Sequence, residues 1–326
     1  MRKLKKHLKR VLFVILSIFL SLHIIPYMLP LPIDSGKLFP PFDESRYMVI
    51  DGIKLHHRSW FPESLHSSSK FVLLVHGMGG STFSWRKQVL SLEQAGHIVV
   101  SVDLPGFGYS DRARGFKHSQ ANRAELLWTF LDQFSQEHNF EIVPKWTLIG
   151  HSMGAGVITE MALQQPDHTD SLVFVGPAVS ILESRFTDLL RYPPAGRWFA
   201  VLMRYVFINQ LSVQALLGSA YGRIPAPEET TGYLMPFLWP GTEHAFLDIA
   251  TTSTQTEVSD LENLNKTCIP VLAIWGEKDS WVPADNADDL GKLIQNLTLI
   301  KLPDAHHCPM ETAEERFNDL ILNWLE

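Results

Sequence analysis

The sequence predicts an α/β protein with a mostly parallel central sheet flanked by helices. Two observations support this prediction. From Tyr47 onward, short apolar runs closed by glycine alternate with stretches of helical periodicity. The runs at 70–77 and 97–106 are almost wholly apolar, as strands are when helices cover both faces of a sheet. The alternation stops after Gly176 and resumes at Ile269, so we expect one fold interrupted by a mainly helical insertion.

The elements follow in chain order. Two β-prone runs around Asp51-Gly52 predict a hairpin, because this dipeptide favours a two-residue turn. Apolar residues at helical spacing predict helices, two of which end at Gly96 and Pro166. The predicted strands are 70–77, 97–106, 146–150, 171–177, 269–276 and 297–302, and the predicted helices are 81–96, 121–139, 153–166, 284–294 and 310–325. We expect the core at 47–176 and 267–326, and a helical cap at 177–266 over the carboxyl edge of the sheet, where open α/β sheets bind ligands.

The first 31 residues predict a transmembrane signal anchor. Six Lys and Arg residues precede residue 11, and an apolar run continues from Val11 to about Leu31, which is long enough to cross a bilayer. The positive-inside rule then leaves the N-terminus in the cytoplasm and the body on the extracytoplasmic side, beyond a linker at 32–46. A cleaved signal peptide followed by secretion remains the alternative, although no Ala-x-Ala-like site follows the run.

Bulk composition excludes some functions. The net charge of −7 becomes −13 once the basic N-terminal cluster is set aside, and so acidic a body argues against nucleic-acid binding. The two cysteines, Cys268 and Cys308, fall at opposite ends of neighbouring predicted strands. We expect both to be free thiols, because a disulfide requires Cα atoms within about 7 Å.

Ser152 is a candidate nucleophile. It is the serine of a G-x-S-x-G pattern, 150–154, placed between a predicted strand and a predicted helix. A tight turn there would expose the hydroxyl, while Gly150 and Gly154 avoid the clashes that side chains would cause. About 0.1 such patterns are expected by chance in a chain of this composition, so the prediction depends on partners elsewhere.

Those partners have candidates after other strands. A glycine-rich loop, 76–80, follows the first buried strand, and the backbone N–H groups of Met78 and Met153 are the candidate oxyanion-hole donors. A phosphate-binding loop is disfavoured, because no Lys-Ser or Lys-Thr closes the run. Asp279 follows one late strand, and the pair His306-His307 follows the next. A serine needs an imidazole to remove its proton, and the imidazole needs a carboxylate to orient it. No spacing predicts a metal site or a cofactor site.

These segments together resemble the α/β-hydrolase superfamily. The matching segments are HGMGGSTFSW, VDLPGFGYSD, GHSMGAG, GEKDSWVP and AHHCPMETAEERF. In that family the catalytic histidine usually follows a glycine and precedes a glutamate by five residues. Glu311 lies five after His306, so the resemblance implies His306 as the base, although Ala305 stands where glycine is usual. It also implies Asp279 as the acid, with Asp304 and Asp285 as poorer alternatives, and a structural role for Asp103.

Serine rather than aspartate at the nucleophile position implies an acyl-enzyme, and hence a serine hydrolase of the esterase or lipase type. The insertion is rich in large apolar side chains, which favours a hydrophobic or lipid-like carboxylic ester as the small-molecule substrate. Acyl transfer, carbon–carbon bond hydrolysis, cofactor-free haloperoxidase chemistry, peptide hydrolysis and ligand binding without catalysis remain alternatives. The large apolar residues of the insertion are Trp198, Phe199, Leu202, Met203, Tyr205, Phe207, Tyr233, Met235, Phe237 and Trp239.

Overall fold

An eight-stranded sheet forms the centre of the molecule, in the order β1-β2-β4-β3-β5-β6-β7-β8. The computed structural model describes residues 2–31, 41–140, 144–178, 186–254 and 256–326. Strands β3 to β8 are parallel, and β1 and β2 pair antiparallel at one edge, so the predicted α/β class is confirmed. The strands are β1 (Ser45–Ile50), β2 (Ile53–Trp60), β3 (Phe71–Val75), β4 (Ile98–Val102), β5 (Trp146–His151), β6 (Thr169–Val175), β7 (Val271–Gly276) and β8 (Leu297–Leu302).

The first two strands form the predicted hairpin. Asp51 and Gly52 both have positive φ, 49° and 79°, which is the conformation that a type I′ turn requires. This turn matches the right-handed twist of the paired strands, and it sets the register of Ile50 opposite Ile53.

Helices cover both faces of the sheet. Alternate strand residues enter two separate cores, with Leu73 of β3 in one and Val72 in the other. The first core takes side chains from helices α3, α4, α10 and α11, and the second from α2, α12 and α13. These helices are α2 (Val89–Gln94), α3 (Gln120–Glu137), α4 (Met153–Gln164), α10 (Val258–Leu264), α11 (Asn286–Leu293), α12 (Pro309–Thr312) and α13 (Glu314–Leu325).

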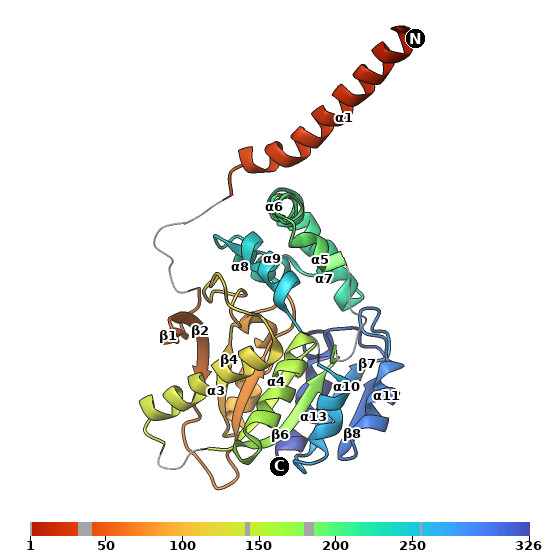
Figure 1. Cartoon of the computed structure of the whole chain (residues 1–326). Coiled ribbons are helices and arrows are strands. Elements are labelled where there is room, and N and C mark those ends of the chain that lie inside the picture. Colours follow the sequence, from red (N-terminus) through yellow and green to blue (C-terminus); the bar gives the residue numbers. More distant parts are fainter. Residues whose placement is uncertain (1, 32–40, 141–143, 179–185, 255) are drawn as a thin grey trace.

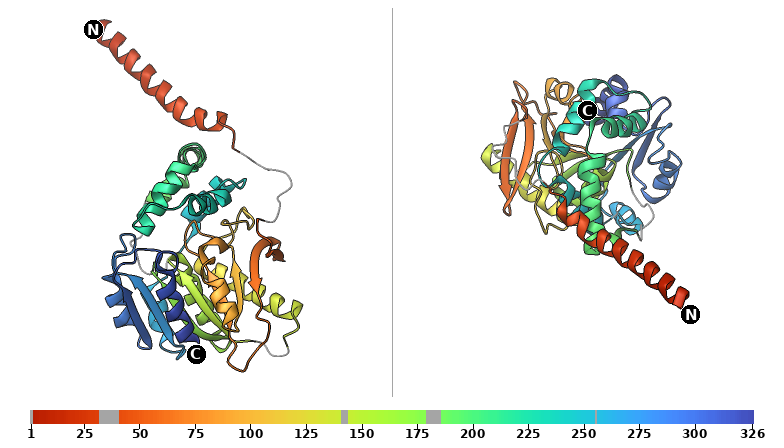
Figure 2. Two further views of the ribbon diagram at one scale, coloured as in Figure 1. Left: turned by 180° about the vertical axis from the view of Figure 1, so that it is seen from behind. Right: turned by 90° about the horizontal axis from the view of Figure 1, so that it is seen from above.

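The insertion lies over the carboxyl edge of the sheet, between the sheet and the N-terminal helix (Figures 1 and 2). Of the predicted cap, residues 179–185 and 255 lie outside the described part of the chain. Leu261 and Leu264 of α10 pack in the first core, as does Ile249 of α9. The cap helices are α5 (Phe186–Leu190), α6 (Pro193–Leu202), the π-helix η3 (Met203–Phe207), α7 (Gln210–Tyr221), α8 (Pro227–Phe237) and α9 (Thr242–Thr252).

Helix α1 (Arg2–Met28) projects from the body of the molecule (Figure 1). Its segment Leu4–Met28 is long and apolar enough to cross a membrane, with a mean hydropathy of 2.3 over its most apolar window. Of the predicted linker at 32–46, residues 32–40 lie outside the described residues, and Ser45 already belongs to β1.

Candidate active site

Ser152 occupies a strained turn between β5 and α4. Its backbone has φ 50° and ψ −115°, a region that a residue with a side chain rarely adopts. The main chain around it is held by hydrogen bonds from Ser152 N to Val175 O (2.9 Å) and from Ala178 N to Ser152 O (3.2 Å). Strain maintained in this way by neighbouring strands is typical of a nucleophile elbow.

Two glycines allow this turn to fit. A Cβ atom at Gly150 would lie 2.6 Å from the carbonyl of Gly154, and a Cβ atom at Gly154 would lie 2.5 Å from Val75 O. Contacts this short do not occur between real atoms, so a side chain at either position would separate α4 from the sheet. The glycines predicted around Ser152 are therefore required by the close packing of β3, β5 and α4.

The glycine-rich loop lies beside the serine. A Cβ atom at Gly77 would lie 3.1 Å from Cβ of Ser152, and the loop turns back through a hydrogen bond from Gly80 N to Gly77 O (3.0 Å). His76 anchors the loop as a neutral imidazole: Nδ1 donates to Gly77 O (2.7 Å), Nε2 accepts from Leu104 N (3.0 Å), and burial lowers its pKa.

The candidate oxyanion donors belong to this loop and to α4. Met153 is the first residue of α4, so its N–H has no acceptor within the helix. Among the described residues, neither the N–H of Met78 nor that of Met153 donates a hydrogen bond to the protein. Both N–H groups therefore lack a hydrogen-bond acceptor among the described residues, as oxyanion donors must before substrate binds.

Asp279 follows β7 and bonds to His307. Its Oδ1 accepts from Trp281 N (2.8 Å) and Val282 N (2.9 Å), and its Oδ2 accepts from Nδ1 of His307 (2.8 Å). Both side chains are buried. The indole of Trp281 stacks on the imidazole, with ring centroids 5.2 Å apart. The carboxylate and the indole together fix the orientation of this histidine.

The structure does not bring His306 to Asp279, which corrects the expected pairing. The backbone at His306 packs on the end of β7, where a Cβ atom at Gly276 would lie 2.2 Å from His306 O. Its imidazole lies against Gly222, where a Cβ atom would meet Nε2 at 2.0 Å. The imidazole of His307, not that of His306, therefore faces the carboxylate. In the sequence, the one sign of this difference is Ala305, which stands where the family usually has a glycine before its catalytic histidine.

Ser152 and His307 lie at the same edge of the sheet. His151, the neighbour of the serine, donates from Nε2 to His307 O (2.9 Å), and the two imidazole centroids are 4.8 Å apart. A Cβ atom at Gly176, which ends β6, would lie 3.5 Å from Nδ1 of His307 and 3.4 Å from Oδ2 of Asp279. The segments after β5, β7 and β8 thus bring the serine, the carboxylate and the imidazole to the same edge of the sheet, beside the end of β6.

Three buried charged residues, Asp103, Glu311 and Arg123, lie near the site but have no role in the proposed chemistry. Asp103 accepts hydrogen bonds from Nδ1 of His56 (2.7 Å), Thr82 N (2.6 Å) and Tyr109 N (2.7 Å). It therefore joins the hairpin to the loops after β3 and β4, which agrees with the structural role expected for it.

Glu311 connects the core to the cap. Its carboxylate accepts from Tyr221 of α7 (2.5 Å) and from Tyr233 of α8, and it pairs with Arg86. The sequence gives no sign of this role, because the two tyrosines are 90 and 78 positions away from Glu311 in the chain. The motif used Glu311 only to align the catalytic histidine.

Arg123 is a buried cation that the sequence analysis did not single out. Its Nη1 lies 3.2 Å from Sδ of Met153, and within the described chain its Nε and Nη2 have no hydrogen-bond partner. Burial lowers its pKa to about 10. An arginine on the same helical face as Leu126 and Leu127 was the available signal, since that face is apolar.

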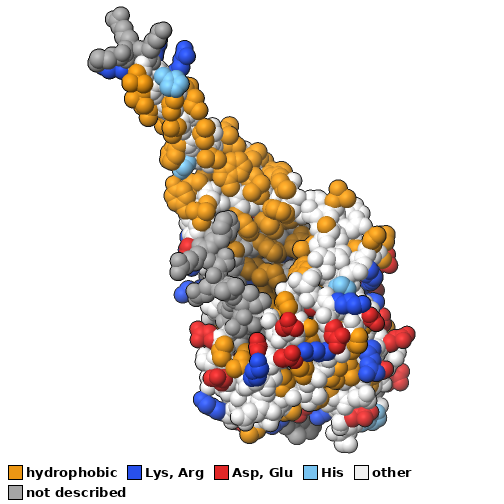
Figure 3. All heavy atoms as spheres, turned by 90° about the vertical axis from the view of Figure 1, so that its right-hand side faces the viewer, with side chains coloured by type: hydrophobic (Ala, Val, Ile, Leu, Met, Phe, Trp, Pro, Cys, Tyr) orange, Lys and Arg blue, Asp and Glu red, His pale blue; other side chains and the backbone are white. Residues whose placement is uncertain are grey.

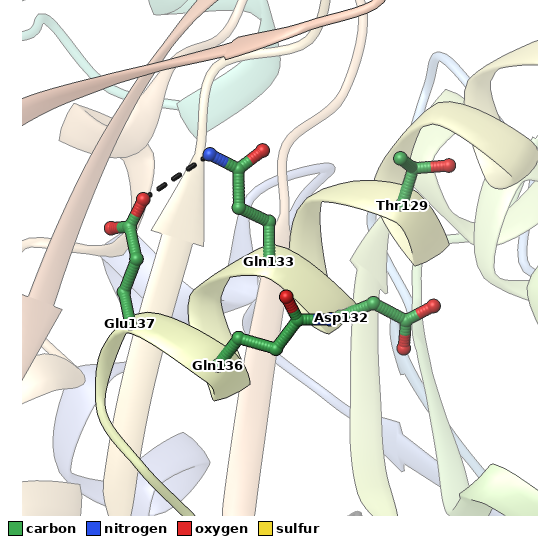
Figure 4. Close-up of a pocket in the computed structure, with 5 residues that line it drawn as sticks. All are labelled: Thr129, Asp132, Gln133, Gln136 and Glu137. Carbon is green, nitrogen blue, oxygen red and sulfur yellow. Dashed lines mark hydrogen bonds between the residues drawn. The ribbon is translucent and has the colours of Figure 1, made fainter.

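A hollow on helix α3 does not form a competing site. The hollow in Figure 4 is lined by Thr129, Asp132, Gln133, Gln136 and Glu137, all from α3. A single helix supplies every lining residue, so there is no opposite wall to enclose a substrate. Within the described residues, no group of three His, Cys, Asp or Glu side chains could hold a metal ion.

A mostly parallel sheet with a strained serine after β5 and an Asp–His pair after β7 and β8 defines an α/β hydrolase. The family model for the alpha/beta hydrolase fold matches residues 70–314, and the chain belongs to this family.

Relatives with known names share most of the chain. The uncharacterized hydrolase YugF of Bacillus subtilis is 25% identical over 86% of this chain and 97% of its own length. The pimeloyl-[acyl-carrier protein] methyl ester esterase of Vibrio atlanticus is 25% identical over 78% of this chain and 94% of its own. A solved structure of a bacterial membrane phospholipase A superposes with a TM-score of 0.66 at 18% identity, covering 98% of this chain and 99% of the other.

Proposed function

We propose that this protein is a membrane-anchored serine hydrolase that cleaves hydrophobic carboxylic esters through an acyl-enzyme on Ser152. The observation that carries the proposal is the strained Ser152 turn at the same sheet edge as the hydrogen-bonded pair of Asp279 and His307. One relative is named as a methyl ester esterase, and a structure of the same fold and length is described as a membrane phospholipase A, which agree with ester chemistry.

The proposed mechanism assigns one role to each group. Asp279 holds Nδ1 of His307, so that Nε2 is the nitrogen that takes the proton of the serine hydroxyl. The serine oxygen then attacks the ester carbonyl, and the N–H groups of Met78 and Met153 bind the resulting oxyanion. His307 returns the proton to the departing alcohol. Water, deprotonated by the same imidazole, attacks the acyl-enzyme and releases the acid.

Aromatic side chains around the loop favour an apolar substrate. A Cβ atom at Gly79 would lie 3.2 Å from Phe237 of α8, so this ring covers the glycine-rich loop. Phe246 of α9 lies 5.6 Å, centroid to centroid, from both Phe237 and Phe107. Aromatic surface next to the reacting serine would bind an acyl chain better than a polar acid.

The activity is tested with a fluorophosphonate probe and a panel of esters on the full-length chain in detergent. We expect the wild type to label and Ser152→Ala not to label. We also expect kcat/KM for p-nitrophenyl esters to rise with acyl chain length from acetate to octanoate. A wild type that does not label contradicts the serine hydrolase, and a preference for acetate contradicts only the hydrophobic substrate.

Anchoring is tested separately. We propose that α1 remains attached as a signal anchor, with its basic end in the cytoplasm. Full-length protein that resists carbonate extraction from membranes would support this, whereas a shortened soluble chain would indicate a cleaved signal peptide.

A further inference from the structure

Within the described residues, five hydrogen bonds join the cap to the last turns of α1 and the residues just after it, one of them between Nε2 of His23 and the hydroxyl of Tyr192 (2.9 Å). Arg197 of α6 donates to Pro26 O (2.9 Å), a carbonyl in the last turn that has no donor within the helix, and to Leu29 O (2.7 Å), just beyond the helix. Tyr205 of η3 donates to Pro30 O (2.6 Å). The cap therefore supplies the C-terminal hydrogen bonds of α1.

The hydrogen bond from Trp198 lies deeper along α1. Pro26 has no N–H, so the carbonyl of Leu22, four residues before it, loses its helical partner. Nε1 of Trp198 donates to this carbonyl (2.9 Å). Leu22 is six residues from the end of α1, which corresponds to about 9 Å along the helix axis.

The position of this contact along α1 places part of the cap within the thickness of the bilayer. The apolar part of α1, from Val11 to Met28, is about 27 Å long, so a hydrocarbon layer of about 30 Å needs all of it. The contact of Trp198 with Leu22 then lies inside that layer. Trp198, Tyr192 and Tyr205 surround the end of α1, and such side chains favour the membrane interface.

The cap presents an apolar face beside α1. The stretches Pro193–Phe207 and Gln210–Tyr221 together are as apolar as a membrane span, but they bend by 89°. A segment bent this sharply is suited to entering one leaflet rather than crossing the bilayer. We name the exposed residues at this bend, Leu202, Tyr205, Val206, Phe207 and Leu211, the cap face; they are 42% to 78% exposed.

The surface continues that of α1 without a polar break. Figure 3 shows hydrophobic side chains running from α1 onto the adjoining part of the cap, with the acidic and basic side chains gathered on the body below. Apolar patches of this extent on a soluble surface mark an interaction site. Because α1 holds this face next to the bilayer, membrane lipid is the partner that the face meets in every molecule.

We infer that the cap face is inserted in the extracytoplasmic leaflet of the membrane that α1 spans, an inference that rests on the proposed anchoring. The cap lies between α1 and the carboxyl edge of the sheet (Figure 1). An amphiphilic ester would then reach Ser152 from the leaflet through the cap, rather than from water.

The insertion is tested by fluorescence quenching on the full-length chain in phosphatidylcholine and phosphatidylglycerol vesicles. An environment-sensitive fluorophore is attached to Val206→Cys or Leu211→Cys in a Cys268→Ser background; native Cys268 is exposed just before β7, at the sheet edge opposite the cap, and serves as the control position. We expect doxyl groups on the lipid acyl chains to quench the two cap labels at least threefold more than the Cys268 label.

Two other outcomes would overturn the inference. Cap labels quenched by aqueous iodide to the same extent as Cys268 would place the face in water. Cap labels shielded from both quenchers at high protein density, but not after dilution with lipid, would assign the face to a second copy of the chain.

A variant separates insertion from catalysis. Leu211→Glu adds a charge to the cap face, and Leu65→Glu adds the same charge to an exposed loop after β2 as a matched control. We expect Leu211→Glu alone to reduce hydrolysis of vesicle lipids about tenfold, with fluorophosphonate labelling unchanged in both. Equal loss in both variants contradicts the inference. If the wild type does not label, the proposed chemistry fails while the quenching result still decides the insertion.

Discussion

Nδ1 of His307 lies 2.8 Å from Oδ2 of Asp279, whereas the neighbouring His306 packs against Gly222. This relationship distinguishes two histidines that are adjacent in sequence, and it makes the roles of the two side chains separable by mutation.

We therefore expect His307→Ala to reduce kcat about 10³-fold, because loss of a general base costs about 10² to 10⁴. His306→Ala is the matched control, and it should stay within about threefold of the wild type. Initial rates on a p-nitrophenyl ester show which histidine is the base, and thermal unfolding of each variant shows whether it is folded. A large loss in His306→Ala together with an active His307→Ala would reverse the assignment.

Asp279→Asn should also reduce kcat, by about 10³-fold or more. Two backbone N–H groups require an oxygen at the Oδ1 position, so the new amide nitrogen must face His307. It would donate to Nδ1 and place the imidazole proton on Nε2, the nitrogen that should accept the proton of the serine. Steady-state kinetics and near-ultraviolet circular dichroism check this; an active, folded variant would show that the tautomer does not matter.

Gly154→Ala should lower the free energy of unfolding by about 3 kcal/mol, because its methyl group would lie 2.5 Å from Val75 O and overpacking is costly. Gly291→Ala is the control, since a Cβ atom there meets nothing within 4 Å. That change within helix α11 should stabilise the protein by about 0.5 to 1 kcal/mol. Urea unfolding in detergent measures both, and equal values would refute the packing argument.

Glu311→Gln should destabilise the attachment of the cap by about 2 kcal/mol, because it removes the nearer of the two carboxylates that pair with Arg86 and leaves only Glu229, 3.5 Å away. Glu314→Gln removes the same charge from an exposed pair with Lys87, and it should cost less than about 1 kcal/mol. Limited proteolysis of the cap, compared with global unfolding, distinguishes a local effect from a general one. Equal sensitivity of the two variants would show that Glu311 does not hold the cap.

Stability should fall as the solution becomes acidic. Burial lowers the pKa of both His57 and His118 from 6.5 to about 3, so each is neutral in the folded protein. Below pH 6.5 these histidines bind protons in the unfolded chain but not in the folded chain. The free energy of unfolding therefore declines as the pH falls from 6.5 toward 3. At about pH 5.5 the loss is about 1.4 kcal/mol per histidine.

The matched variant is His57→Phe, because His57 packs against Phe130 and Phe134 with ring centroids 5.0 and 6.0 Å away. The loss of unfolding free energy between pH 7.5 and pH 5.5 should shrink by about 1.4 kcal/mol in this variant. An unchanged loss would mean that His57 is protonated in the folded state.

Every strand predicted from the sequence is present, and most of the parallel strands are almost wholly apolar and have glycine at or shortly after their end. Helix boundaries were less accurate. The helix predicted at 81–96 is a 3₁₀ turn (Thr82–Trp85), capped by the hydroxyl of Ser81, followed by the short α2. The closing helix is divided at Ala313, whose φ of −126° leaves the helical region.

By itself, the sequence determined the fold, the glycine-flanked serine, and the order in which an acid and a pair of histidines follow it. Local patterns carry this information, because strand ends and tight turns depend on residues within a few positions. Only the tertiary structure showed which histidine bonds to Asp279, because this depends on how the end of β7 packs against the backbone of Ala305 and His306. Likewise, only the packing of α6 against α1 shows that an apolar cap lies beside the helix long enough to span a membrane.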